Sequence, residues 1–191
     1  MSERRQLNPE AATIQVVTRR RGVLAKVGHD LLLQLRRFEL TLDAGARDAS
    51  PSGRAQSIVL RADTHSFYVV AALSGDTPAP AALSDRDKRK IERSLVNDVL
   101  HSEHFPEAEF QGEAQPRDAH VGITGMLTLH GHSRTLSTTA HRESWDNQWG
   151  WFCELSLHQP DFGIKPYSAL LGSLEVHPDV QVRVWVPEAA P

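Results

Sequence analysis

Short alternation of apolar and polar residues dominates this chain. The clearest cases lie at 121–129, 149–157 and 180–186, where apolar residues or glycine occupy every second position. A period of two is typical of a half-buried β-strand. Weaker versions of the pattern lie at 13–19, 57–63, 66–70, 107–113 and 134–142. The pattern therefore predicts a series of short β-strands.

The segment 31–42 alternates too, but its phase changes in the middle. Three leucines, Leu31, Leu33 and Leu35, share one face, and after Arg36 and Arg37 the apolar positions are Phe38, Leu40 and Leu42. A bulge near residues 36 and 37 would return both sets to one interior. We expect a long strand that bends here.

One segment has the period of a helix. Ser84 can cap its start, and Ile91, Leu95 and Val99 follow at i, i+4 and i+8. We expect a helix over about 85–100 that lies with this stripe on the sheet. Eight or nine strands with one helix predict a single all-β domain over 1–191, either a barrel or a sandwich, in which closure removes exposed sheet edges.

Composition and charge exclude several classes of protein. The 191 residues are 40% hydrophobic and 24% charged, with a net charge of -3, so nothing indicates disorder or nucleic-acid binding. A single cysteine, Cys153, excludes an internal disulfide. The start lacks an apolar signal core, and no apolar run approaches the ~18 residues that span a membrane. We expect a soluble, cytoplasmic protein.

The candidate chemistry is sparse. Ten histidines bring no three ligands together at a metal-binding spacing, and there is no nucleophile elbow or phosphate-binding glycine loop, so we expect no metal or cofactor. His29 and Asp30 are either a hydrogen-bonded pair at a strand entrance or polar groups at a cavity mouth. Trp149 and Trp151 share the apolar face of their strand, where large rings either fill a core or line a ligand cavity.

Five short segments, taken in order, resemble the YceI-like family of polyisoprenoid-binding proteins. They are 21–30 (RGVLAKVGHD), 105–110 (FPEAEF), 125–131 (GMLTLHG), 161–164 (DFGI) and 178–180 (PDV). None is specific alone, but their order and separations match over about 14–186. The family is typically bacterial and often periplasmic. We expect this chain to be a divergent member, because its first residues do not read as a signal peptide and because 165–172 looks like an insertion.

The resemblance implies a lipocalin-like antiparallel β-barrel of about eight strands with one flanking α-helix and a long apolar pocket. It implies an isoprenoid or another long-chain lipid as ligand. The residues that we expect to line the pocket are His29, Leu33, Leu35, Phe67, Leu127, Trp149, Trp151, Leu155 and Phe162. The cations that could hold an anionic head group are Arg19, Arg20, Arg21 and Lys26, which could equally form a solvated turn.

The leading hypothesis is therefore a non-enzymatic lipid binder. Burial of each CH₂ group contributes about 0.8 kcal/mol, so tight binding of a prenyl chain needs no catalytic group. Two alternatives stay open: an enzyme that uses His29 and Asp30 as an acid/base pair on a small hydrophobic substrate, and an interaction module whose barrel is filled by its own side chains.

Overall fold

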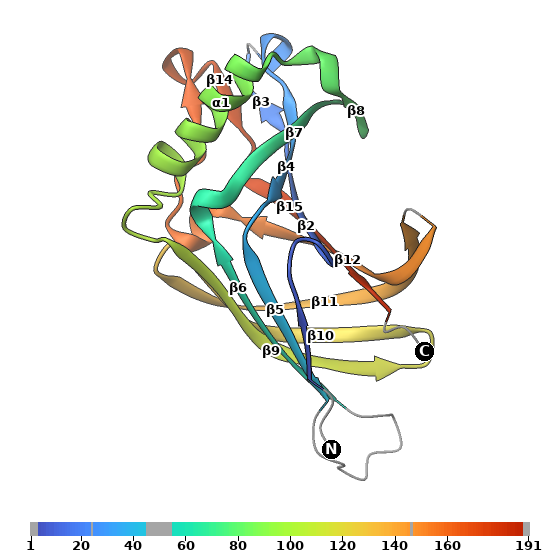
Figure 1. Cartoon of the computed structure of the whole chain (residues 1–191). Helices are drawn as coiled ribbons and strands as arrows, with labels where there is room; N and C mark the ends of the chain where they lie inside the picture. Colours follow the sequence, from blue (N-terminus) through green and yellow to red (C-terminus); the bar gives the residue numbers. More distant parts are fainter. Residues whose placement is uncertain (1–3, 24, 45–54, 146, 189–191) are drawn as a thin grey trace.

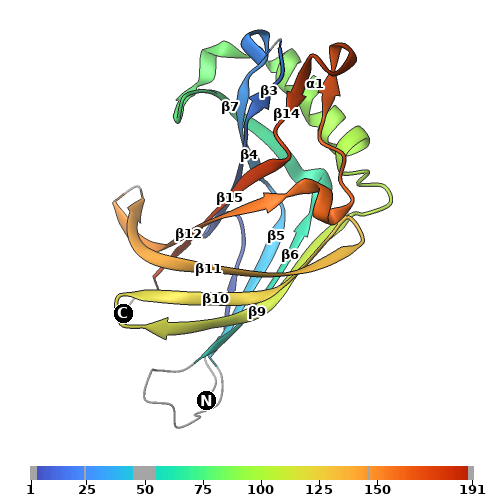
Figure 2. The ribbon, with the colours of Figure 1, turned by 180° about the vertical axis from the view of Figure 1, so that it is seen from behind.

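A curled antiparallel sheet forms the body of the protein (Figures 1 and 2). The computed structural model describes residues 4–23, 25–44, 55–145 and 147–188. In spatial order the strands of the main sheet are β1 (Arg4–Leu7), β5 (Phe38–Ala44), β6 (Gln56–Asp63), β9 (Glu107–Arg117), β10 (His120–Leu129), β11 (His132–Trp145), β12 (Gln148–His158), β15 (Asp179–Pro187), β2 (Thr13–Thr18), β4 (Asp30–Leu35), β7 (Phe67–Ser74) and β8 (Thr77–Ala79).

A second, small sheet lies at the top of Figure 1, beside the helix. Its strands are β13 (Ser168–Ala169), β14 (Leu174–Val176) and β3 (Arg20–Arg21). The helical elements are α1 (Asp85–Ser94), a π-turn η4 (Leu95–Val99) that continues it, and the 3-10 turns η1 (Ala25–Val27), η2 (Thr64–Ser66), η3 (Pro80–Ala82), η5 (Gln159–Phe162) and η6 (Leu170–Gly172).

The predicted all-β architecture with one flanking helix is confirmed, but the predicted closed barrel of about eight strands is wrong in both its closure and its strand count. The main sheet has 12 strands, and its order runs from β1 to β8 without pairing those two ends, so the described residues form a half-barrel. Two causes raise the count. Long strands break at corners, and two of the twelve, β1 and β8, have only four and three residues, too few to show alternation.

One such corner lies at Arg36 and Arg37, where the phase of the leucine pattern changes. The strand is broken there, and the register shift of β4 against β7 lies instead between Leu32 and Leu33. The amide of Arg36 donates to the carbonyl of Ser66 in the second corner, between β6 and β7. Leu35 and Phe38 pack in the same core on the two sides of the break. Leu35 from the first set therefore shares an interior with Phe38 and Leu40 from the second.

The helix occupies the predicted span, with its last turn wound as a π-helix. The side chain of Ser84 accepts from the amide of Asp87 and caps the first turn. Leu95 and Val99 pack into the core, as the apolar stripe predicts. The same helix also lies along the part of β7 that β8 leaves unpaired. Glu92 Oε1 accepts from the amide of Val69 at 2.9 Å, and Lys88 Nζ donates to the carbonyl of Val70 at 3.0 Å. These bonds satisfy backbone groups that an edge strand leaves open.

The apolar side chains gather on the concave side of the sheet. One cluster holds Leu7, Ile14, Leu35, Phe38, Leu40, Ile58, Ala62 and Ala114. A second holds Val99, Leu100, Leu157, Phe162, Ile164 and Val180. Phe67 and Val182 pack against both clusters and so make the interior continuous.

The outer face carries an aromatic contact that the alternation alone did not reveal. Trp185 is 7% exposed although it alternates with the inward valines of β15. Its ring lies over Gly150 and 6.3 Å from the ring of Trp145. Any side chain at position 150 would collide with this indole, so glycine is required there.

No helix in the described parts of the chain is long and apolar enough to cross a membrane.

Candidate functional site

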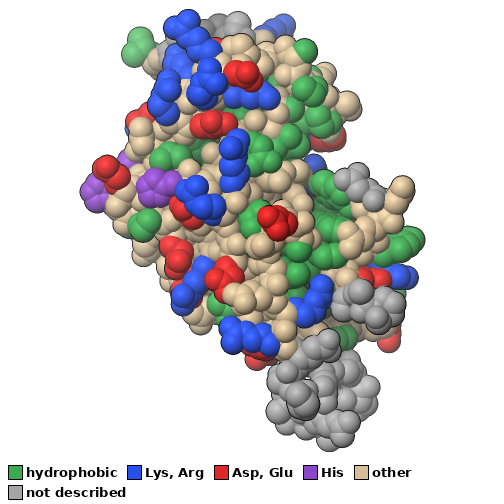
Figure 3. All heavy atoms as spheres, viewed as in Figure 1, with side chains coloured by type: hydrophobic (Ala, Val, Ile, Leu, Met, Phe, Trp, Pro, Cys, Tyr) green, Lys and Arg blue, Asp and Glu red, His purple; other side chains and the backbone are tan. Residues whose placement is uncertain are grey.

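The concave face of the half-barrel is apolar and incompletely covered. We call this face the trough. Its half-buried side chains are Leu42, Leu60, Phe67, Phe110, Val121, Ile123, Leu127, Leu155, Val182, Val184 and Val186. In Figure 3 hydrophobic side chains line a hollow beside the β11–β12 hairpin. Because part of each of these side chains is exposed to solvent, an apolar ligand or partner could bury the remaining apolar surface.

Strand pairing aligns the trough across the sheet. Leu127 pairs with Phe110 on β9, and Leu155 pairs with Val182 on β15. Directly paired residues point to the same face. In the middle of the trough floor, Gly112 and Gly125 pair, and the ring of Phe110 lies over them. A Cβ at Gly125 would come within 2.5 Å of that ring, so the small residues make room for the aromatic side chain.

The two tryptophans of β12 lie at the end of the trough near the hairpin. Trp151 is half-buried and pairs with Val186, which places it on the trough face. Trp149 follows on the same face but is 53% exposed. The guanidinium of Arg142 lies 4.8 Å from the Trp149 ring centre and binds Glu188 with two hydrogen bonds of 2.6 and 2.9 Å. An indole, a cation and a carboxylate thus meet at this end of the trough.

The other predicted pocket residues fall into two groups: some are half-buried on the trough face, and others are buried in the core beneath it. Leu33 and Leu35 are 3% and 5% exposed, so they lie within the core rather than on the open surface of the trough. Phe162 is 2% exposed and belongs to the cluster beneath Leu127 and Leu155. Phe67, Leu127 and Leu155 pack against the second cluster together, and Trp151 shares the trough face with Leu155 on β12.

The predicted head-group cations lie on and around the small sheet. Arg19 directly follows β2, and Trp151 lies near the opposite end of that strand, which at about 3.3 Å per residue is some 20 Å away. Arg19 binds Asp30 at 3.3 Å and also binds Asp76, and this pairing raises its pKa above the usual value against the opposing effect of desolvation. Arg21 binds Glu175 at 2.9 Å. Lys26 is exposed.

His29 and Asp30 do not form a pair with each other in the described structure. Asp30 Oδ1 accepts from the amide of Arg20 at 2.8 Å, and its other oxygen binds Arg19, while His29 is exposed. Asp30 thus fixes the start of β4 through its bonds to Arg19 and Arg20. Cys153 is buried in the wall beside Val184, and burial raises the pKa of its thiol to about 11. A thiol with that pKa is protonated at neutral pH and is a poor nucleophile.

A histidine cluster beside the trough was missed by sequence reasoning. Leu127 and Leu129 face inward, so the alternation predicts that His130 points outward at a hairpin tip, yet His130 is only 9% exposed. The tight turn at His130 and Gly131, both with positive φ, rotates the ring inward. There His130 stacks on Phe105 at 4.2 Å and bonds to the carbonyl of Phe162 at 3.2 Å. Among the described residues, no three His, Cys, Asp or Glu side chains gather closely enough to hold a metal ion.

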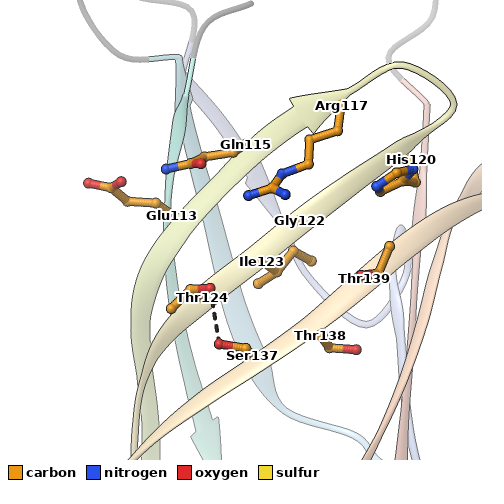
Figure 4. Close-up of a pocket in the computed structure, with 10 residues that line it drawn as sticks. All are labelled: Glu113, Gln115, Arg117, His120, Gly122, Ile123, Thr124, Ser137, Thr138 and Thr139. Carbon is orange, nitrogen blue, oxygen red and sulfur yellow. Dashed lines mark hydrogen bonds between the residues drawn. The ribbon is translucent and has the colours of Figure 1, made fainter. Parts of the chain in front are cut away.

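A separate pocket of about 570 Å³ lies on the outer face of the sheet (Figure 4). Its lining residues are Glu113, Gln115, Arg117, His120, Gly122, Ile123, Thr124, Ser137, Thr138 and Thr139. Thr124 and Ser137 share a hydrogen bond of 3.1 Å across it. The lining is mostly polar, so this pocket does not suit a hydrocarbon chain. The trough is the better site for an apolar ligand.

Comparison with one solved structure supports the fold, and two weaker matches accompany it. The crystal structure of BcnA from Burkholderia cenocepacia matches with a TM-score of 0.63 and 13% identity, over 93% of this chain and 96% of that one. A polyisoprenoid-binding domain from Saccharophagus degradans matches with a TM-score of 0.47 and 10% identity, over 95% and 98%. The YceI protein of Campylobacter jejuni matches with a TM-score of 0.48 and 12% identity, over 82% and 85%.

Comparison of the sequence itself identifies the family. No curated protein matches it significantly. The sequence profile of the YceI-like domain, however, matches residues 6–186, which is nearly the whole chain and contains all five of the segments that carry the resemblance. This protein belongs to the YceI-like family.

Proposed function

We propose that the protein binds the hydrocarbon chain of an isoprenoid or a similar long-chain amphiphile in the trough, without catalysing a reaction. The observation that carries the proposal is the continuous row of half-buried apolar side chains from Phe67 and Leu127 to Trp151 and Val186. Membership of the YceI-like family supports the same ligand class.

The energetics favour a long apolar chain. Each buried CH₂ group contributes about 0.8 kcal/mol, so a chain that covers several trough side chains reaches micromolar affinity or better without a strong polar contact. Binding also buries apolar surface of the protein, because the ligand covers the half-buried valines of β15. The arrangement of His29 and Asp30 gives no support to an acid/base mechanism, since the Asp30 carboxylate is bound to Arg19 and the Arg20 amide.

Two substitutions on one strand test the trough directly. Ile123 faces the trough from β10, whereas its neighbour Thr124 faces the outer side. We expect Ile123→Lys to weaken binding of the prenyl alcohol geranylgeraniol at least tenfold, because the chain would meet an ammonium group. Thr124→Lys adds the same charge outside the trough and should bind as the parent protein does. Quenching of intrinsic tryptophan fluorescence, to which Trp151 contributes, gives the dissociation constant.

A filling substitution separates lost binding from lost folding. Val121→Trp would occupy the trough with an apolar ring, and we expect a folded protein that no longer takes up the alcohol. Native mass spectrometry after mild purification provides an independent measurement, with a co-purified lipid mass expected for the parent protein. An apo mass with no uptake of added prenyl alcohol would favour the filled module instead. Equal affinities of the Ile123 and Thr124 variants would place the ligand elsewhere.

A further inference from the structure

Two large apolar side chains project from loops of the small sheet, where they contact little of the protein. Val23 is 92% exposed and Leu171 is fully exposed, whereas the next most exposed large hydrophobic residues in the described chain, Trp149 and Met126, are 53% and 51% exposed. The two loops start from neighbouring strands. The carbonyl of Ser173 lies against Gly22, one residue before Val23. Both loops rise at the top of Figures 1 and 2, on the same end of the molecule.

The backbone at Leu171 adds to the argument. Its φ of 55° lies in the left-handed region, which is unfavourable for a residue with a branched side chain. Glycine or asparagine would adopt this conformation more easily, and an exposed leucine gains nothing from burial in return. Folding of the isolated chain therefore gives no reason for a leucine at this position. Contact with an apolar partner would give one.

Basic side chains outnumber acidic ones on the helix at this end of the molecule. On α1, Arg86, Arg89, Lys90 and Arg93 are exposed together with the acidic Asp85 and Asp87, and Lys26 is exposed on η1. Figure 3 shows Lys and Arg gathered over α1 at this end of the molecule. The chain as a whole has a net charge of -3, so this concentration of cations is local. Isolated exposed apolar residues are ordinary on protein surfaces, but here two of them coincide with a basic field.

We propose that this end of the molecule docks on an anionic phospholipid membrane, with Val23 and Leu171 inserted among the lipids and the α1 arginines and lysines over the phosphates. Apolar side chains that enter the interface and basic residues near an anionic surface each add to such binding. The occupant is a lipid surface because both loops end in single protruding side chains, which suit shallow insertion into a fluid layer. Docking of this kind does not depend on the proposed ligand in the trough.

Flotation with phospholipid vesicles tests the proposal. We expect the full chain to float at low salt with vesicles of phosphatidylcholine and phosphatidylglycerol, and to stay behind with phosphatidylcholine alone. Replacing Val23 and Leu171 with asparagine should weaken binding about tenfold for each side chain. Asparagine suits the left-handed backbone at 171, so the variant should fold. Replacing Arg89 and Lys90 with glutamine should weaken binding about fivefold for each charge.

Met126→Asn is the matched control, because it removes an exposed apolar side chain from β10, in the main sheet. It should float as the parent protein does. Failure of the parent protein to bind anionic vesicles would overturn the proposal, and so would equal binding by the asparagine double variant or an equal loss in the Met126 variant. Geranylgeraniol binding measured without vesicles keeps the two proposals separate, since the double variant should retain it.

Discussion

Nδ1 of His101 lies 3.1 Å from Nε2 of His130, so the segment that follows the helix is bonded to the β10–β11 hairpin. The carbonyl of Phe162 can only accept, so Nδ1 of His130 donates to it and carries the proton. Nε2 of neutral His130 then accepts from Nδ1–H of His101. A proton taken up at Nε2 of His130 would remove this acceptor, and the bond would persist only if His101 moved its own proton from Nδ1 to Nε2 and accepted instead.

We therefore expect stability to fall on mild acidification. Burial lowers the pKa of His130, and His101 and His132 lower it further, against the opposing bond to Phe162. The unfolded chain binds a proton at about pH 6.5, whereas folded His130 does so only at lower pH. Its contribution is thus complete above about pH 6.5 and is lost as the pH falls through the lowered pKa. Urea titrations across this range should show the slope, and His130→Asn should flatten it. An equal slope in His130→Asn would contradict the assignment, and exposed His120→Asn serves as the control.

The edge of β7 should depend on Glu92. Its carboxylate accepts from the amide of Val69, and Glu92→Ala leaves that amide without this partner. We expect a loss of about 2 kcal/mol in the free energy of unfolding, together with faster hydrogen exchange at the Val69 amide. Arg93→Ala, an exposed change on the same helix, should stay within about 0.5 kcal/mol. Unchanged exchange at Val69 in the Glu92 variant would show that the helix does not protect this edge.

Phe162 should contribute strongly to the stability of the core beneath the trough. The side chain is 2% exposed and packs with Val180 and Ile164 in the second cluster. Phe162→Ala should cost about 4 kcal/mol through lost burial and the cavity that it leaves, and Phe162→Leu about 1.5 kcal/mol. Chemical denaturation followed by circular dichroism measures both. A cost below about 1 kcal/mol for the alanine variant would mean that this site collapses around the smaller residue.

The head-group role of Arg19, Arg20, Arg21 and Lys26 stays a prediction. Arg19 and Arg20 hold Asp30, so their removal would also disturb the start of β4. Neutralising Arg21 and Lys26 with glutamine avoids this. If these cations hold an anionic head group, the double variant should bind a prenyl diphosphate less tightly while binding the matching alcohol as before, and the difference should shrink in high salt. Equal effects on the two ligands would remove the head-group role and leave the trough unaffected.

Local patterns in the sequence were enough to determine the repeating elements. Alternation located β9 to β12 and β15, because each strand has one face against the core and one toward solvent. The Ser84 cap and the stripe of Ile91, Leu95 and Val99 located the helical segment, since both signals act within a few turns. The ordered segments also identified the family, and with it the apolar concave face, which includes Leu127, Trp151 and Leu155.

Tertiary structure decided what depends on contacts between distant residues. Alternation assigns residues to two faces but does not reveal what covers each face, so the burial of Trp185 by Gly150 and Trp145 was not predictable. A turn of two residues brought His130 against Phe162, against the phase of its strand. Arg19 binds Asp30 and Asp76, which lie in two other segments, and Lys88 and Glu92 of the helix bond to the backbone of β7. Each outcome is set by packing between elements, which short-range periodicity does not encode.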